Sequence, residues 1–428
     1  MEIKKSTEKD YVSPEIVIGR DWEDLKRFGT KGTIYIGKHL VGTGENAHLT
    51  TPVLLDVLRP HLITLTGKRG TGKSYTMGTF AEELLNLPSD IKSNLCGIMI
   101  DTQGIFWTMK SPAEFLPYFK EWNIEPKGFN VRVYVPEGQR NIFQEAGVIF
   151  DDTFSISPSQ LTYEDWLFIF DLQMNDILGI LLQRILANFT PKTIDEIINR
   201  IKTIQGFEKE KMALENLFSA SKQWGIFGDK KMPQLLVPGQ VSIIDVSLTP
   251  QSIRELLVAL IARMIIYERM LARRQEEFGI MSGEEKRNVP MCWLMIDEAH
   301  NFIPNDRETV ATAPLMKIVK EGRQPGISLI FATQQPYKLH PDALSQCDLL
   351  VAHRLTSKDD IEALKSIMQT YILFDITKYM EELPRVSGVA LILDDNSERI
   401  YKIRMRPRQS WHAGSSPIAL RVGGKRSF

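Results

Sequence analysis

A glycine-rich segment with a lysine and a serine is the strongest chemical signal in this chain. Residues 67–74 read GKRGTGKS and fit the pattern G-x-x-x-x-G-K-[ST] between an apolar run and a helical pattern. The glycines let the backbone N–H groups face phosphate oxygens, and the helix N-terminus adds partial positive charge. Lys73 can reach the outer phosphates, and the Ser74 hydroxyl can hold Mg²⁺. The predicted nucleotide-binding set is Gly67, Lys68, Arg69, Gly70, Thr71, Gly72, Lys73, Ser74 and Tyr75.

Two carboxylates follow another apolar run. Asp297 and Glu298 come directly after WLMI, and an acid at the end of a buried strand lies where α/β sheets bind ligands. We expect Asp297 to hold Mg²⁺ and Glu298 to act as general base on an attacking water. The alternative is that both carboxylates cap the start of a solvated helix. A phosphate loop in the same chain makes this alternative less favoured. For His300 two roles are left open: it can support the acidic pair, or it can be merely structural.

Two further polar residues flank the run ISLIFAT (327–333). Gln334 follows it and is the predicted sensor, because an amide beside the acidic pair can orient water near a terminal phosphate. The alternative is an amide that closes a turn before Pro336. Arg323 precedes the run in a glycine-flanked turn, and by itself it would be an ordinary solvated residue.

Short apolar runs with turn or helix signals between them must position these residues. Continuous runs of this kind predict strands covered on both faces, hence an α/β fold with a mainly parallel sheet. From 158 to 232 the apolar spacing becomes helical, and a further helix is predicted from the N-cap Thr249 to about Phe278. The predicted strands are 61–66, 96–101, 131–136, 241–247, 291–297, 327–333, 348–354 and 388–394.

This pattern divides the chain into five segments. Residues 1–32 are expected to be a short extension, 33–157 and 233–398 the two parts of the ATPase core, 158–232 a helical insertion, and 399–428 a basic arm.

Composition narrows the class of protein. The 428 residues carry 52 Lys and Arg against 53 Asp and Glu, a net charge of −1 that excludes a uniformly basic DNA binder. Three scattered cysteines predict a reduced, intracellular protein. The charged N-terminus lacks a signal-peptide core, and no apolar stretch is long enough for a membrane span, so a cytoplasmic location without membrane association is expected.

The ordered motifs resemble the FtsK/HerA superfamily of P-loop motors, and specifically its HerA branch. The resemblance extends from about Ile34 to His412 and is weak across 158–232. It implies a RecA-like core, a hexameric ring and helicase-type translocation of double-stranded DNA at the expense of ATP and Mg²⁺. It also implies a NurA-like nuclease or another effector as partner, in DNA repair or defence. The segments that carry the resemblance are IGKHL…TPVLLDVLRPHLITLTGKRGTGKS, IDTQGIFW, GQVSIIDVSLTP, WLMIDEAHNFIP, KEGRQPGISLIFATQQP and LSQCDLLVAHRLTSKDD.

The resemblance also implies roles for individual residues. Asp297 and Glu298 match the Walker B pair, Gln334 the sensor, and Arg323 the arginine finger that enters the neighbouring subunit's site. Asp101 matches the acid of the family's D-x-x-G-E element and is counted among the catalytic residues.

Three departures from the family pattern stand out. Only 66 residues precede Gly67, so the N-terminal HerA-type β-barrel is expected to be truncated or absent. In the phosphate loop, Arg69 and Thr71 replace Thr and Ser, and Lys68 and Arg69 can add phosphate contacts. Ile105 replaces the glutamate of the D-x-x-G-E element.

The C-terminal arm and the DNA contacts are less specific. The arm has eight Lys and Arg after residue 398 and no acid. It is compatible with a solvated tail, with nonspecific DNA contact, or, by the resemblance, with RPRQSWH bracing the adjacent subunit near its nucleotide. Candidate DNA contacts are Lys110 beside Trp107, and Arg307 and Lys317 in the predicted loop 304–317.

Two alternatives to a motor remain. A nucleotide-gated ring scaffold that positions a nuclease or defence effector without processive movement would suit a shortened N-terminus. A conjugation or secretion ATPase of the same superfamily is expected to carry a membrane anchor, which the sequence does not suggest.

Overall fold

The computed structural model describes residues 15–42, 47–283, 288–367 and 376–414. In these residues, thirteen strands form one mixed sheet in the order β1-β3-β2-β13-β12-β11-β4-β10-β9-β5-β8-β6-β7. The strands are β1 (Ile16–Ile18), β2 (Thr33–Val41), β3 (His48–Asp56), β4 (Leu62–Thr66), β5 (Leu95–Asp101), β6 (Arg132–Pro136), β7 (Asp152–Phe154), β8 (Val241–Asp245), β9 (Met291–Ile296), β10 (Ile327–Thr333), β11 (Leu349–His353), β12 (Val389–Asp394) and β13 (Arg399–Met405).

The sheet has a parallel and an antiparallel part. From β11 through β4, β10, β9, β5, β8 and β6 to β7, every neighbouring pair is parallel. β12, β13, β2 and β3 then continue the sheet with antiparallel pairs, and β1 pairs parallel with β3. The predicted mainly parallel α/β fold is therefore confirmed, and each of the eight predicted strands is present to within two residues.

Helices cover both faces of the sheet. Alternate residues of β5 point to opposite sides: Ile98 joins the apolar cluster of α10 and α11, whereas Met99 joins that of α2. A continuous apolar run is needed because neither face meets water. The helices are α1 (Trp22–Phe28), α2 (Lys73–Asn86), α3 (Ser89–Lys92), α4 (Tyr118–Trp122), α5 (Arg140–Glu145), α6 (Tyr163–Phe170), α7 (Ile177–Leu186), α8 (Ile194–Thr203), α9 (Glu208–Lys222), α10 (Gln251–Ser282), α11 (Thr312–Glu321), α12 (Pro341–Ser345), α13 (Lys358–Ile367) and α14 (Ile376–Glu382).

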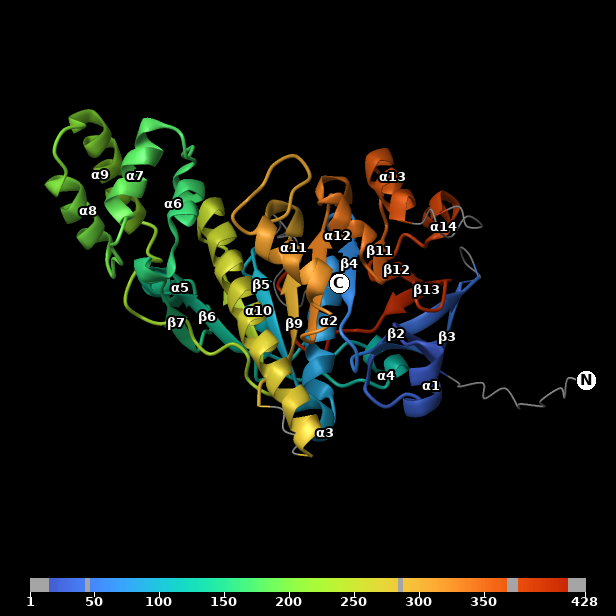
Figure 1. Cartoon of the computed structure of the whole chain (residues 1–428). Coiled ribbons are helices and arrows are strands. Elements are labelled where there is room, and N and C mark those ends of the chain that lie inside the picture. Colours follow the sequence, from blue (N-terminus) through green and yellow to red (C-terminus); the bar gives the residue numbers. More distant parts are fainter. Residues whose placement is uncertain (1–14, 43–46, 284–287, 368–375, 415–428) are drawn as a thin grey trace, which may run out of the picture.

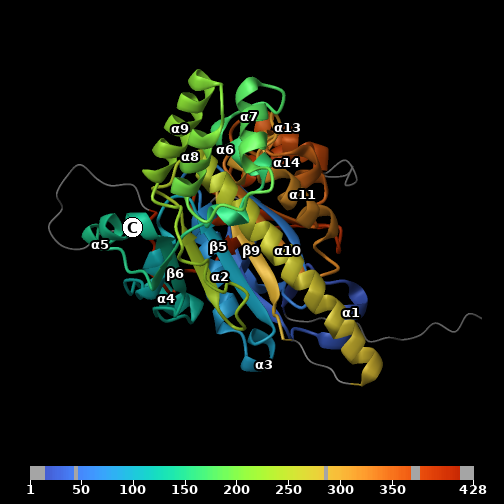
Figure 2. The same ribbon diagram turned by 60° about the vertical axis from the view of Figure 1, so that its left-hand side comes forward.

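The segment 158–232 contains α6, α7, α8 and α9, which gather at one end of the molecule beside α10 (Figures 1 and 2). An aromatic group holds them together: the rings of Trp166 and Phe218 are 4.9 Å apart between centroids, in an edge-to-face arrangement. Arg263 of α10 donates two hydrogen bonds of 2.8 and 2.9 Å to the buried carboxylate of Asp165 in α6. The helical segment is thus tied to the long helix that packs on the sheet.

The ends of the chain differ from the sequence prediction. Residues 15–32, the described part of the predicted extension, belong to the core, because β1 adds to the sheet and Arg20 donates to Asp56 of β3 from a buried position. The predicted arm begins with β13, which lies inside the sheet between β12 and β2. Half-buried strands with mixed polar residues give no continuous apolar run, and their partners are distant in sequence. Thr249 was also wrongly predicted as N-cap: Pro250 holds that position, and the Thr249 hydroxyl has no partner among the described residues.

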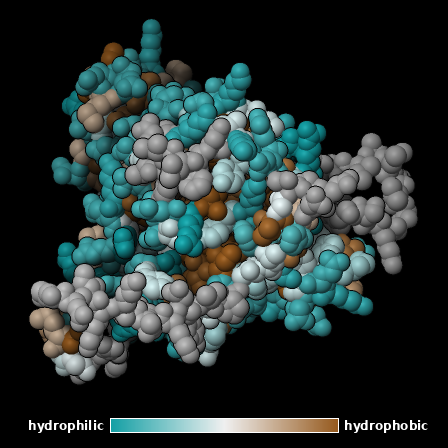
Figure 3. Space-filling view, turned by 90° about the vertical axis from the view of Figure 1, so that its right-hand side faces the viewer, coloured by the Kyte–Doolittle hydropathy of each residue, from teal (hydrophilic) through white to brown (hydrophobic). Residues whose placement is uncertain are grey.

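One face of the molecule lies at the end that carries α1, β2 and β3. Hydrophilic residues cover most of this face, with a patch of hydrophobic residues near its centre (Figure 3). Within the described ranges, no helix is both long enough and apolar enough to cross a membrane.

Candidate active site

Three adjacent parallel strands bring the predicted site residues to one edge of the sheet. β4 leads into the loop 67–74, β10 ends before Gln334, and β9 ends before Asp297. The order β4-β10-β9 puts the sensor strand between the phosphate loop and the acidic pair. Because parallel strands end at the same edge, residues far apart in sequence meet there.

The loop 67–74 has a backbone that requires glycine. Gly70 and Gly72 have φ values of +79° and +121°, a region that residues with a side chain rarely adopt. A Cβ on Gly67 would lie 2.5 Å from the Cβ of His353. The side chains of Lys68 and Arg69 are exposed at the outside of the loop. Neither side chain has a hydrogen bond or ion pair with a described residue, so their predicted phosphate contacts stay a prediction.

His353, at the end of β11, supports the loop and was not singled out from the sequence. One ring nitrogen, Nδ1, lies 2.9 Å from the carbonyl oxygen of Val389, and the other lies 2.9 Å from the Thr76 hydroxyl of α2. Since a carbonyl only accepts, Nδ1 donates and Nε2 accepts from Thr76. Burial lowers the pKa of His353 to about 4, so the ring is neutral. Its only sequence signal was a polar residue ending an apolar run.

Lys73, the first residue of α2, is buried at 5% exposure. Burial lowers its pKa, and the charges of Glu298 and Asp297 oppose that change, which shows that the three groups are close. Its ammonium lies 3.5 Å from the carbonyl oxygen of Lys68, a weak contact that a phosphate can replace.

Asp297 and Glu298 have different surroundings. Asp297 is fully buried, and one carboxylate oxygen, Oδ2, has no hydrogen-bond partner in the described structure. Burial and the carboxylate of Glu298 raise the pKa of Asp297 to about 7. An unpartnered carboxylate oxygen near Lys73 of the phosphate loop suits Mg²⁺, which takes few protein oxygens and several waters or phosphates.

Glu298 is held in an unusual conformation. Its φ is +51°, in the left-handed region that is uncommon for a residue with a side chain. Its Oε1 accepts hydrogen bonds from the amides of Gln334 and Gln103, the latter at 3.3 Å. His300 Nδ1 lies 3.0 Å from the Thr333 hydroxyl and 3.5 Å from Glu298 Oε2, and burial lowers its pKa. His300 therefore lies beside the acids as a neutral ring.

The surroundings of Asp101 do not fit the catalytic role that the sequence predicts for it. Its carboxylate is fully buried and accepts four backbone N–H groups, from residues 103 to 106, at 2.8 to 3.1 Å. Burial and the carboxylate of Asp245 raise its pKa, and the N–H donors oppose the rise. With both oxygens engaged by its own loop, Asp101 holds that loop and does not face the reacting atoms. Ile105 belongs to the apolar cluster under α2, so the missing acid has no polar replacement at that position.

Arg323 lies far from its own chain's phosphate loop. It is exposed in the turn between α11 and β10, at the edge where the parallel strands begin. Two adjoining hollows there share Asp21, Arg59, Pro60 and Arg323 in their linings. Arg59 is paired with Asp24, whereas the Arg323 side chain has no hydrogen bond or ion pair with any described residue. Within one chain, Arg323 cannot reach the site at the opposite edge.

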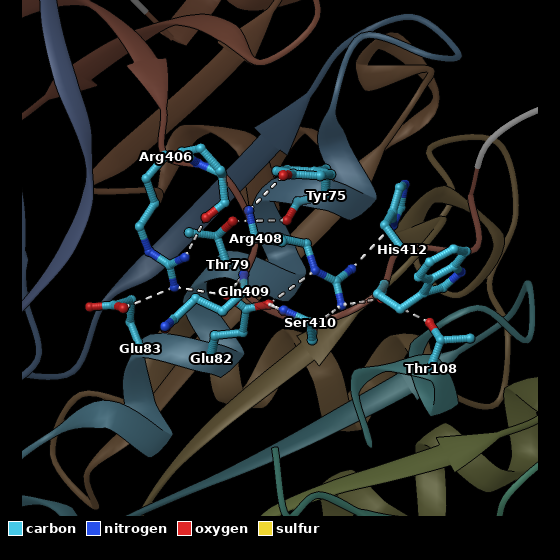
Figure 4. A network of polar contacts seen from close by, with 12 residues as sticks. Tyr75, Thr79, Glu82, Glu83, Thr108, Arg406, Arg408, Gln409, Ser410 and His412 are labelled. Carbon is cyan, nitrogen blue, oxygen red and sulfur yellow. Dashed lines mark hydrogen bonds and ion pairs between the residues drawn. The ribbon is translucent and has the colours of Figure 1, made fainter. Parts of the chain in front are cut away.

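The described part of the C-terminal arm packs on its own chain's phosphate-loop helix (Figure 4). Arg406 and Arg408 are each 1% exposed, and both pair with Glu82 of α2. The backbone N–H of Arg408 donates to the Tyr75 hydroxyl at 2.5 Å, and the rings of Tyr75 and His412 are 5.2 Å apart. The expectation of a solvated tail is therefore wrong for these residues. Arg399, Lys402 and Arg404 lie in β13, whereas Arg421, Lys425 and Arg426 lie outside the described residues.

The candidate DNA contacts are dispersed. Lys110 pairs with Asp151 at 2.8 Å, and Arg307 with Glu255 at the same distance. Lys317 is exposed on α11, so the stretch predicted as a loop over 304–317 ends in a helix from Thr312.

Comparison with known proteins adds sequence relatives. The family model described as "Helicase HerA, central domain" matches residues 34–265. The chain is 20% identical over 345 residues to the DNA double-strand break repair helicase HerA of Sulfurisphaera tokodaii, covering 79% of this chain and 62% of that protein. It is 34% identical over 86 residues to the probable HerA of Methanocaldococcus jannaschii, covering 20% and 17%. The matched region thus spans less than two thirds of either relative.

Solved structures share the fold. VirB4 of Thermoanaerobacter pseudethanolicus has a TM-score of 0.55 at 14% identity, covering 89% of this chain and 97% of that one. The bacterial conjugative coupling protein TrwBdeltaN70 has a TM-score of 0.53 at 15% identity, covering 91% and 99%. At this identity the likeness concerns the fold, a RecA-like P-loop ATPase core.

Proposed function

Because this chain belongs to the HerA helicase family, we propose that it is an ATP-hydrolysing motor that moves along double-stranded DNA. The observation that carries the proposal is the convergence of Lys73, Glu298 and Gln334 at one edge of the sheet. A phosphate-binding loop, a general base and an amide that contacts the base are the groups that nucleotide hydrolysis needs.

Each group has a defined part in hydrolysis. Backbone N–H groups of the loop 67–74 and the ammonium of Lys73 bind the β- and γ-phosphates and offset their charge. Glu298 takes a proton from a water, whose oxygen attacks the γ-phosphorus while the bond to the β-phosphate oxygen breaks. Gln334 orients the carboxylate of Glu298 through its amide.

Ser74 and Asp297 would hold a magnesium ion. The fit rests on the buried, unpartnered Oδ2 of Asp297, whose charged form a nearby cation would favour. When bound, the ion supplies electrostatic stabilisation of the phosphate oxygens.

A second copy of the chain completes the site in this proposal. Arg323 is exposed at the edge of the sheet opposite to its own phosphate loop, and it pairs with no described residue. Head-to-tail packing of copies brings that edge to the neighbour's nucleotide, where the guanidinium offsets the charge of the transition state. Such packing forms a ring when the rotation per copy divides a full turn, and we propose a closed hexamer, as the family resemblance implies.

We further propose that DNA passes through the ring and that a NurA-like nuclease or another effector acts with it in DNA repair or defence, in the cytoplasm. The names of the relatives, which refer to double-strand break repair, support the DNA substrate. The pore contacts are expected to be phosphate contacts without base readout.

The experiment is ATP turnover with and without duplex DNA, together with displacement of a third strand from a triplex. Turnover stimulated by duplex DNA, with displacement, supports the motor. Slow turnover that DNA does not change, without displacement, indicates instead a nucleotide-gated scaffold for a nuclease or defence effector. The Glu298→Gln variant is the control for hydrolysis by contaminants.

A further inference from the structure

Gln103 lies on the side of Glu298 opposite to Gln334. Glu298 follows β9, and β9 lies between β10 and β5 in the sheet. Gln334 follows β10, and Gln103 comes two residues after the end of β5. The Nε2 atoms of both amides donate to the same carboxylate oxygen, Oε1 of Glu298. The carboxylate is therefore held from both neighbouring strands.

The main chain below Gln103 is fixed. The buried carboxylate of Asp101 accepts the N–H groups of residues 103 to 106. Gly104 has a φ of +68°, and a Cβ there would lie 2.8 Å from the Ser247 hydroxyl, so the turn passes close to the end of β8. The Gln103 side chain is exposed, but these contacts hold the main chain from which it extends.

Only one oxygen of Glu298 is engaged by these amides. Oε2 is buried and has no hydrogen-bond partner among the described residues, and the nearby Nδ1 of His300 is shared with the Thr333 hydroxyl. A non-glycine residue stays in the left-handed region only where surrounding contacts hold it, and the two amides on Oε1 are such contacts. With Oε1 held on both sides, Oε2 is the oxygen that can accept a proton.

We propose that Gln103 is a positioning residue for hydrolysis, which together with Gln334 holds Oε1 of Glu298 so that Oε2 meets the attacking water. This inference rests on the proposed function, because it takes Glu298 as the general base. The Gln103 amide also contacts the carboxylate of Asp297, but Gln103 itself touches neither nucleotide nor water in this scheme.

The test is the steady-state kinetics of Gln103→Leu, which removes the donor at similar volume. We expect kcat to fall on the order of tenfold to a hundredfold, as for other small misplacements of a reacting group, with KM for ATP unchanged within about twofold because phosphate binding is not touched. Gln103→His, which keeps an N–H donor, should recover most of kcat. Thr102→Val is the matched control: it changes the neighbouring residue of the same loop, whose hydroxyl has no partner among the described residues, and should leave kcat unchanged.

A double-mutant cycle separates positioning from a general structural effect. In the Glu298→Gln background, Gln103→Leu should cause no further loss of single-turnover hydrolysis, because there is no base left to position. An equal loss in both backgrounds, or no loss in the unmodified chain, would overturn the inference while leaving the proposed ATPase intact. Absence of turnover in the unmodified chain, with or without duplex DNA, would overturn both.

Discussion

Arg408 and Glu82 form an ion pair inside the protein, with side chains 1% and 0% exposed, although 326 positions separate them in sequence. Glu82 also accepts hydrogen bonds from Arg406 Nη2 at 2.9 Å and from the Ser410 hydroxyl at 2.6 Å. Gly78 of the same helix makes room for this contact, since a Cβ there would lie 2.6 Å from an Arg408 nitrogen. The segment after β13 is thereby fixed to the helix that begins with Lys73.

Glu82→Leu should strongly destabilise the fold. The variant leaves the buried guanidinium of Arg408 without a carboxylate, while Arg406 keeps its pair with Glu83. Removing one partner of a buried pair costs about 3–5 kcal/mol. Chemical denaturation measures the free energy of unfolding. The control is Asp195→Asn, which breaks the largely exposed pair with Lys222 and should change the free energy of unfolding by less than about 1 kcal/mol. Similar small effects for both variants would contradict the importance of the buried pair.

Glu298→Gln should separate ATP binding from hydrolysis. The amide keeps the shape of the side chain but cannot accept a proton, so turnover should fall by about 10²–10⁴-fold. Affinity for a non-hydrolysable analogue should remain within a few-fold, because Lys73 and the loop 67–74 are unchanged. Single-turnover hydrolysis and equilibrium binding measure the two effects. Unchanged hydrolysis would show that Glu298 is not the general base.

Arg323→Ala should strongly lower ATP turnover, and mixing with a complementary variant should restore part of that turnover. Loss of an arginine finger lowers the rate by about 10³-fold or more, while binding of nucleotide to the single chain should persist. A mixture with Lys73→Ala copies should regain part of the activity, because some interfaces then combine an intact Lys73 loop with an intact Arg323.

Two results would contradict that arrangement. The first is no recovery on mixing, provided that both variants assemble to the same mass as the unmodified chain. The second is full turnover by single copies at a dilution where light scattering finds no oligomer.

His61 should make stability depend on pH. The ring is fully buried, with Nδ1 2.6 Å from an Asp348 oxygen and Nε2 3.3 Å from an Asp56 oxygen. Burial lowers its pKa, but the two carboxylates outweigh this and raise it to about 9. Since the pKa in the folded state exceeds the unfolded value of 6.5, the stabilisation is complete below about pH 6.5 and is lost as pH rises through 9.

The corresponding measurement is the free energy of unfolding from pH 6 to 10. For a shift of this size the unmodified chain should lose about 3 kcal/mol over that range through His61. In His61→Asn this part of the pH dependence should disappear. A pH profile that is the same for both chains would show that the ring is neutral in the folded protein.

The sequence by itself determined the parallel core and the chemistry of the site. Strands covered on both faces must be continuously apolar, and the loop 67–74 must have glycine at fixed positions before its lysine and serine. Both leave local signals that need no knowledge of distant contacts. For the same reason Asp297, Glu298 and Gln334 were recognisable, each as a polar residue directly after an apolar run. Together with the ordered motifs, these residues also predicted the family.

Only the tertiary structure decided which of these residues meet. Strand order puts β10 between β4 and β9, and it thereby puts Gln334 and Gln103 on either side of Glu298. In the folded chain, the carboxylate of Asp101 also faces its own loop. Arg408, which composition alone classed with a basic tail, is buried. Arg408 is buried because Glu82, distant in sequence, satisfies its charge. The physical reason is that the fold sets the contacts between neighbouring strands and between distant segments, and local sequence does not contain those partners.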